Sequence, residues 1–172
     1  MKKLLLLLLI APVLGFGQSQ YRLESHTETQ MGNNRKFIRD YDENGNLIYY
    51  VFKNFDEDSQ TFINANKYNY IYDNNNLRIE SSQSKWENES WVGLQKNELE
   101  YINGVISTNT QSAWEDGLWV YDLKYVYVYD TNVSDQRLSI ERLRWSNDTW
   151  VEYNKTEYEY DTNGNETIQK YF

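Results

Sequence analysis

The fold is decided by a stretch that recurs along the chain, and its clearest copy is WSNDTWVEYNKTEYEYDTNGN, residues 145–165. This stretch begins with two tryptophans that have four residues between them. It continues through a segment in which aromatic and polar residues alternate, and it ends in a Tyr-Asp pair and an Asn-Gly turn. Alternation with a period of two is typical of a half-buried β-strand. The stretch therefore predicts a long strand with a turn at each end.

The same unit is found repeatedly upstream. All six tryptophans of the chain occur in such pairs: Trp86 and Trp91, Trp114 and Trp119, and Trp145 and Trp150. A tyrosine follows ten residues after the second member of each pair, and the same offset joins Phe62 to Tyr72, so residues 55–62 are a diverged and longer copy. The tyrosines that mark the units are 31, 29, 28 and 31 residues apart: Tyr41, Tyr72, Tyr101, Tyr129 and Tyr160. Regular spacing of this kind indicates a repeat of about 30 residues.

Both ends of each predicted strand carry turn signals. A type I′ hairpin turn needs positive φ at its two central residues, which Asn and Gly tolerate best. Asn44-Gly45, Asn103-Gly104 and Asn163-Gly164 are predicted to fill these positions. At the other end, the four residues inside each tryptophan pair are predicted to form a hairpin loop that places the two rings directly across from each other. Because ten is an even number, the second tryptophan and the tyrosine of one strand are predicted to share a face.

Eleven predicted strands follow from these turns, and no helical pattern appears beyond the N-terminal segment. We therefore expect an all-β fold, an antiparallel meander of two-strand hairpin repeats that forms one long coiled sheet. The sequence leaves open whether the sheet closes into a soluble barrel. The expected strands are residues 21–29, 35–41, 46–54, 62–72, 76–85, 91–101, 105–113, 119–129, 137–145, 150–160 and 166–172.

The first residues resemble an export signal. Two lysines precede an apolar run from Leu4 to about Leu14, and small residues follow at Gly15 and Gly17. This order is typical of a secretory signal peptide, and the apolar run is too short to span a bilayer as a helix. We expect residues 1–17 to be a signal peptide, residues 18–172 to be a single β-repeat domain without a transmembrane segment, and the protein to be exported to the periplasm, the cell surface or the medium.

The Tyr-Asp turns resemble those of the YD-repeat family, the repeats of RHS-type surface and toxin-shell proteins. The resemblance rests on Tyr41-Asp42 with Gly45 and on Tyr160-Asp161 with Gly164. The chain would be a tryptophan-pair variant of this family of exported bacterial surface proteins. The resemblance implies an extracellular β-sheet array that contacts carbohydrate or encloses cargo.

No group of residues in the sequence resembles a catalytic site. The chain has one histidine and no cysteine, so a nucleophile with its base is not recognisable, and no cofactor motif is present. A net charge of −9 without a basic run is unfavourable for binding nucleic acid. We therefore expect a non-enzymatic protein without a cofactor. The alternative is a secreted glycoside hydrolase that uses two of the many carboxylates, or an accessory subunit of one.

Two turns bear some likeness to the opening of calcium loops, in which alternate oxygens bind the cation. They begin at Asp42 and Asp161, which are the candidate metal ligands. Both turns lack the bidentate glutamate that completes such loops. Asp and Asn also stabilise turns by accepting hydrogen bonds from the backbone, and this second interpretation is the favoured one.

The tryptophan pairs are the candidate ligand-contact residues. Aromatic rings that face each other across a hairpin stabilise it by about 0.5–1.5 kcal/mol beyond their burial. Exposed rings along a rigid sheet could also stack on sugars, and equivalent sites in each repeat would bind with avidity. Both interpretations stay open, and they lead to one functional hypothesis: an exported repeat protein that presents a binding or structural surface for adhesion, for the cell envelope or for carbohydrate. The expected partners are glycans or envelope components, contacted by Trp86, Trp91, Trp114, Trp119, Trp145 and Trp150.

Overall fold

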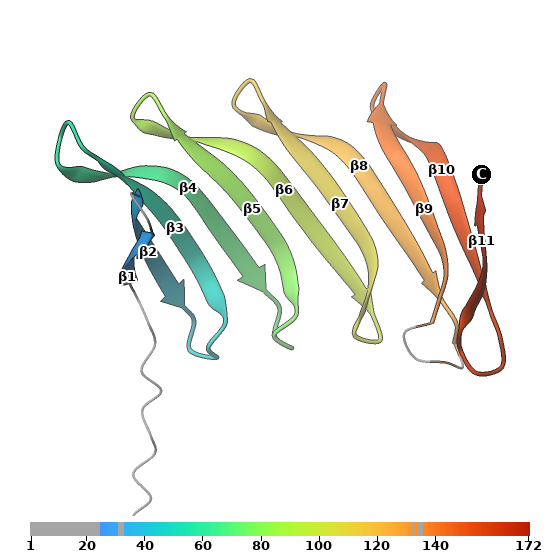
Figure 1. Ribbon diagram of the computed structural model, residues 1–172. Helices are drawn as coiled ribbons and strands as arrows, with labels where there is room; N and C mark the ends of the chain where they lie inside the picture. Colours follow the sequence, from blue (N-terminus) through green and yellow to red (C-terminus); the bar gives the residue numbers. More distant parts are fainter. Residues whose placement is uncertain (1–24, 31–32, 132, 134–135) are drawn as a thin grey trace, which may run out of the picture.

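The computed structural model describes residues 25–30, 33–131, 133 and 136–172, and these form one antiparallel sheet in which the strands are ordered as in the sequence (Figure 1). The proposed signal peptide, residues 1–17, lies outside the described residues. The eleven strands are β1 (Ser25–Gln30), β2 (Asn33–Tyr41), β3 (Leu47–Asp56), β4 (Thr61–Tyr72), β5 (Arg78–Glu87), β6 (Ser90–Ile102), β7 (Val105–Glu115), β8 (Leu118–Tyr129), β9 (Arg137–Ser146), β10 (Thr149–Tyr160) and β11 (Glu166–Tyr171).

The sheet is an open single layer. Strands β1 and β11 are its two edges and do not pair with each other, so the described strands do not close into a barrel. Among the described residues, Figure 1 shows no other element over either face of the sheet. The predicted all-β meander is confirmed, and the question of closure is answered by the free edges. In the described part of the chain, no helix is long and apolar enough to cross a membrane.

The hairpin turns at the tryptophan pairs are tighter than the sequence analysis predicted. Glu87 pairs with Ser90, so only Asn88 and Glu89 form the loop, and both have positive φ, 47° and 61°. Positive φ at both positions is the type I′ geometry, whose twist matches that of the flanking strands. The β7–β8 and β9–β10 hairpins have the same two-residue turn at their tips. These tips lie along the upper edge of the sheet in Figure 1.

The turns at the other end of the strands, where the Asn-Gly pairs lie, are of two kinds. Asn103 and Gly104 both have positive φ, as predicted for a type I′ turn. At Asn44-Gly45 the prediction is wrong, because only the glycine has positive φ; the same is true at Asn163-Gly164. The reason is the preceding aspartate: in the first of these turns, Asp42 Oδ1 accepts the backbone N–H of Asn44 at 3.0 Å, which stabilises an Asx turn instead.

Each hairpin with an aromatic pair at its tip contains a β-bulge, and this overturns the prediction that tryptophan and tyrosine share a face. In each of four strands, one residue is left without a partner in the pairing with the preceding strand. This unpaired residue lies three positions after the second aromatic residue of the pair at the hairpin tip. The extra residue shifts the alternation by one, so everything beyond it changes face. These four bulged residues are Ala65, Leu94, Asp122 and Tyr153. The pairings at the opposite turns each skip one residue as well: Ile48, Ile79, Ser107, Leu138 and Thr167.

The two faces of the sheet consequently differ in composition. Residues that are opposite each other in the register share a face, so the register assigns each position. The tryptophan face carries the six tryptophans with Phe55 and Phe62, together with most of the strand lysines and glutamates. The arginine face carries the five tyrosines of the repeat turns, most of the other strand tyrosines, and six arginines: Arg35, Arg39, Arg78, Arg137, Arg142 and Arg144.

Little hydrophobic surface is fully buried in this layer. Among the described residues, the buried hydrophobic side chains are Val51, Leu99 and Ile140. The other apolar and aromatic side chains are partly covered by neighbours on the same face. The fold is therefore held together by the backbone ladder and by cross-strand side-chain pairs rather than by a core between two layers.

Three of the repeat tyrosines join the two strands of a hairpin at the end opposite its aromatic pair. The hydroxyl of Tyr101 on β6 donates a hydrogen bond to the carbonyl oxygen of Arg78 at 2.8 Å, and the hydroxyl of Tyr160 on β10 donates to the carbonyl oxygen of Arg137 at the same distance. Tyr72 makes the equivalent bond to Leu47. Because the acceptor lies at the start of the neighbouring strand, these tyrosines hold that end of the three hairpins in register.

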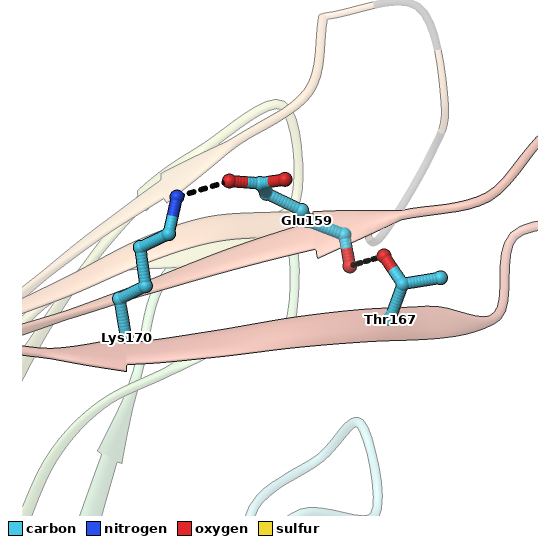
Figure 2. A network of polar contacts seen from close by, with 3 residues as sticks. All are labelled: Glu159, Thr167 and Lys170. Atoms are coloured by element: carbon cyan, nitrogen blue, oxygen red, sulfur yellow. Dashed lines mark hydrogen bonds and ion pairs between the residues drawn. The ribbon is translucent and has the colours of Figure 1, made fainter.

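Strand β11 ends the described sheet and is exposed along its whole length. Figure 2 shows how polar contacts attach it to β10: Thr167 Oγ1 donates to the carbonyl oxygen of Glu159 at 3.1 Å, and Lys170 forms an ion pair with the Glu159 carboxylate. A charged side chain on an edge strand opposes pairing with further strands.

Candidate functional site

The six candidate tryptophans form three clamps, by which we mean the cross-strand pairs at the hairpin tips. As predicted, the members of each pair are direct partners in the register. The ring centroids of Trp114 and Trp119 are 4.8 Å apart with an interplanar angle of 74°, so the edge of one ring meets the face of the other. The other two pairs have centroid distances of 5.0 Å and similar angles. Phe55 and Phe62 form a fourth clamp of the same shape, at 5.2 Å.

Two of the clamps also pack sideways on the preceding repeat. Trp114 lies so closely over Gly93 that a Cβ atom added there would be 2.6 Å from its ring. In the next repeat Tyr121 occupies the position equivalent to Gly93, and its ring lies 5.2 Å from Trp145 and 5.5 Å from Trp150. The clamps are therefore linked into a row along one edge of the tryptophan face.

Cations lie beside two of the clamps. Lys67 Nζ is 5.0 Å from the ring centroid of Trp91, and Lys124 Nζ is 6.0 Å from that of Trp150. Ammonium groups in such positions are attracted to the ring face. Elsewhere on this face the lysines lie beside glutamates: Lys96 pairs with Glu98 at 3.1 Å and Lys155 with Glu157 at 2.7 Å. Charge on the tryptophan face is thus locally balanced.

All six tryptophans are partly buried: none is enclosed and none projects freely. The clamp geometry covers part of each ring, and the other part is left uncovered because the described elements form no second layer over the sheet (Figure 1). Neighbouring clamps are two strands apart, which corresponds to about 10 Å at the usual strand spacing. The arrangement can offer aromatic surface at regular intervals to an extended ligand.

The two candidate calcium ligands are engaged within their own turns. Asp161 Oδ1 accepts the backbone N–H groups of Asn163 and Asn165, both at 2.9 Å, and Oδ2 accepts the Asn165 side-chain amide at 2.9 Å. Asp42 is bonded in the same way to Asn44 and Asn46. The side-chain hydrogen bond from Asn165 is the main cause of the lowered pKa of Asp161. Within the described ranges, no three His, Cys, Asp or Glu side chains converge as metal ligands would.

A second cluster, on the arginine face, was not identified from the sequence. Guanidinium groups lie over aromatic rings along the sheet, as in Arg39 over Tyr50 at 5.1 Å and Arg144 over Tyr153 at 4.7 Å. The bulges hide part of this pattern, because a strict period of two places Tyr125, Tyr127 and Tyr158 on the tryptophan face. The one signal in the sequence is the group of three arginines between residues 137 and 144.

The fold and the aromatic row define an open, single-layer β-repeat protein. No protein-family model matches the chain, and no curated protein matches it. Among solved structures it is similar to a protein with unknown function from Bacteroides fragilis NCTC 9343, at 19% identity and a TM-score of 0.55, over 70% of this chain and 91% of that one. At this identity the likeness shows the fold alone.

Two shorter matches have lower scores. A DUF3836 family protein from Bacteroides vulgatus ATCC 8482 is 23% identical with a TM-score of 0.41, over 49% of this chain and 89% of that one. Another DUF3836 family protein, from Parabacteroides distasonis ATCC 8503, is 19% identical with a TM-score of 0.40, over 49% of this chain and 77% of that one. We base no conclusion on these two.

Proposed function

We propose that the protein is a non-enzymatic, exported β-repeat protein whose tryptophan face contacts carbohydrate of the cell envelope or its surroundings. The observation that carries this proposal is the row of three tryptophan clamps on one face of a sheet over which the described part of the chain forms no second layer. The N-terminal signal supports export, and the likeness of the Tyr-Asp turns to YD repeats supports a place among bacterial surface proteins.

The geometry suits an extended polysaccharide better than a single sugar. Each clamp offers only the part of its rings that the partner ring leaves uncovered, so one clamp would bind weakly. Clamps about 10 Å apart match the length of about two linked sugar rings, so one chain could contact all three. Several weak contacts on a rigid sheet add to a useful affinity through their effective concentration.

A glycan array followed by titration of the best ligand tests this proposal. The decisive variants are Trp114→Phe and Trp119→Phe, because Phe55 and Phe62 show that phenylalanines form the same clamp. These variants should keep the wild-type circular dichroism and unfolding midpoint while affinity falls about tenfold, equivalent to about 1.4 kcal/mol. Folded variants that bind as tightly as the wild type would refute the proposal, and so would a wild-type protein that binds no glycan on the array.

A further inference from the structure

Three arginines on β9 form a separate feature that the tryptophan face does not use. Arg137, Arg142 and Arg144 all point to the arginine face, with the buried Ile140 between them. Each guanidinium lies over a tyrosine ring of β8 or β10. The carbon at the centre of the Arg137 guanidinium is 5.1 Å from the ring centroid of Tyr158 and 6.0 Å from that of Tyr127; Arg142 is 5.8 Å from Tyr125, and Arg144 is 4.7 Å from Tyr153. We call these three residues the arginine strip.

The strip has no anionic partner within the described chain. None of the three arginines forms an ion pair with a described carboxylate; the ion pairs of the described residues involve lysines. The Nε atoms of Arg137 and Arg142 are buried without a hydrogen-bond acceptor, and Arg142 Nη1 donates only to the neutral Asn154 side chain at 3.2 Å. A buried Nε atom is out of a ligand's reach, so the capacity of the strip to bind an acceptor lies in the terminal Nη groups, which are not among the buried unpartnered atoms.

The architecture does not require arginine at these positions. Counting back from the first tryptophan of each clamp, the residues of β7 that are equivalent to Arg137, Arg142 and Arg144 are Ile106, Gln111 and Ala113. Strand β7 nevertheless pairs with both neighbours and carries the same bulges. A hairpin of the same shape thus forms with an aliphatic, an amide and a methyl side chain in place of three guanidinium groups. The arginines are a property of this repeat rather than of the fold.

We propose that the arginine strip binds the carboxylate groups of an acidic polysaccharide that lies along β9. A guanidinium presents a planar fork of N–H donors that matches a carboxylate, and stacking on tyrosine holds this fork in place while leaving its edge free. The strip spans about 20 Å from Arg137 to Arg144, which suits several successive uronate units. Nucleic acid fits less well, because arginines already occupy the tyrosine faces on which bases would stack.

The overall charge of −9 repels a polyanion at long range, so binding depends on short-range ion pairs at the strip itself. Salt screens ion pairs at a partly exposed surface, and it screens the long-range repulsion as well. Affinities are therefore compared between variants at one fixed sodium chloride concentration.

Calorimetric titration of the full-length protein with polygalacturonate tests the proposal, with neutral dextran as the negative ligand. The triple variant Arg137→Gln, Arg142→Gln, Arg144→Gln should lose at least tenfold in affinity. Its matched control is Lys53→Gln, Lys96→Gln, Lys155→Gln, which removes the same charge from the tryptophan face and should change affinity less than twofold. Equal losses in the two variants would overturn the proposal, as would a wild-type protein that does not bind polygalacturonate.

A gain-of-binding variant keeps the test decisive if the arginine-to-glutamine protein does not fold. Gln111→Arg with Ala113→Arg copies part of the strip onto β7, on the same face, and should increase affinity for polygalacturonate at least threefold. No increase in the folded variant would count against the proposal. Tighter binding of single-stranded DNA than of polygalacturonate would show that the ligand class is wrong. Because this site lies on the opposite face and takes a different ligand, its failure would not affect the proposed function of the tryptophan face.

Discussion

Substitution of Gly93 by alanine tests how tightly neighbouring repeats pack against each other. A Cβ atom at this position would lie 2.6, 2.7 and 2.8 Å from three ring atoms of Trp114, whereas ordinary contacts begin at 3.4 Å. The difference between 3.4 and 2.6 Å means that the ring must retreat by about 0.8 Å to accept alanine. Its retreat is restricted by Trp119, whose centroid is only 4.8 Å away. Gly93→Ala therefore creates a steric conflict inside the row of clamps.

The sign of the change in unfolding free energy on Gly93→Ala shows whether the contact with Trp114 constrains this position. Gly93 is not among the residues with positive φ, so its backbone accepts alanine without strain. Without the tryptophan, the substitution would stabilise the protein by about 0.4–1 kcal/mol, because alanine reduces the freedom of the unfolded chain. Overpacking costs about 1–3 kcal/mol. We expect a net destabilisation of about 1–2 kcal/mol.

Urea unfolding followed by circular dichroism measures this change. The matched background is Trp114→Ala, which removes the ring and should make Gly93→Ala neutral or stabilising. The two substitutions should therefore be strongly non-additive, as expected for residues in contact. A Gly93→Ala protein that is as stable as the wild type would refute the reasoning, as would an equal cost in both backgrounds.

Three other predictions follow from single positions. Glu89 has a φ of 61° in a tight turn, so Glu89→Gly should raise the free energy of unfolding in urea by about 1 kcal/mol; a loss of stability would contradict this. The pKa of Asp161 is lowered when folded, so its contribution is present above the ordinary value of 3.8 and is lost as the pH falls through the folded pKa. Wild-type stability should accordingly fall more steeply below pH 4 than that of Asp161→Asn, and equal slopes would exclude this role. Val51 is 2% exposed, so Val51→Ala should cost about 2 kcal/mol, whereas Ile71→Ala, at a site 49% exposed, should change stability by less than about 0.5 kcal/mol. Thermal or urea unfolding measures both variants, and equal losses of stability for the two substitutions would contradict this expectation.

The predictions that held depend on short-range features of the chain. The strand count and the direct pairing of Trp114 with Trp119 follow from turn signals and a repeat length that recur every 30 residues. A hairpin is specified by a few neighbouring residues, so its position can be read without knowledge of the rest of the fold.

The predictions that failed concern places where a second local interaction changes the backbone geometry that the sequence pattern indicates. Asn44-Gly45 contains a type I′ signal, but the Asp42 carboxylate bonds the turn backbone and selects another geometry. The bulge at Asp122 leaves no clear mark in the alternation, yet it moves Tyr125 and Tyr127 to the face opposite Trp119. In the same way, the bulge in β9 places Arg137 on the same face as Arg142 and Arg144, which strict alternation along the sequence does not predict.

The sequence by itself determined a meander of hairpins with tryptophan clamps at three of the tips, because each of these features is specified within one repeat. Only the tertiary structure decided which residues share a face and that the sheet stays open. The face depends on the extra residue at each β-bulge, and a bulge exists only when two strands pair. Closure depends on the twist accumulated over all the strands, which no single repeat contains.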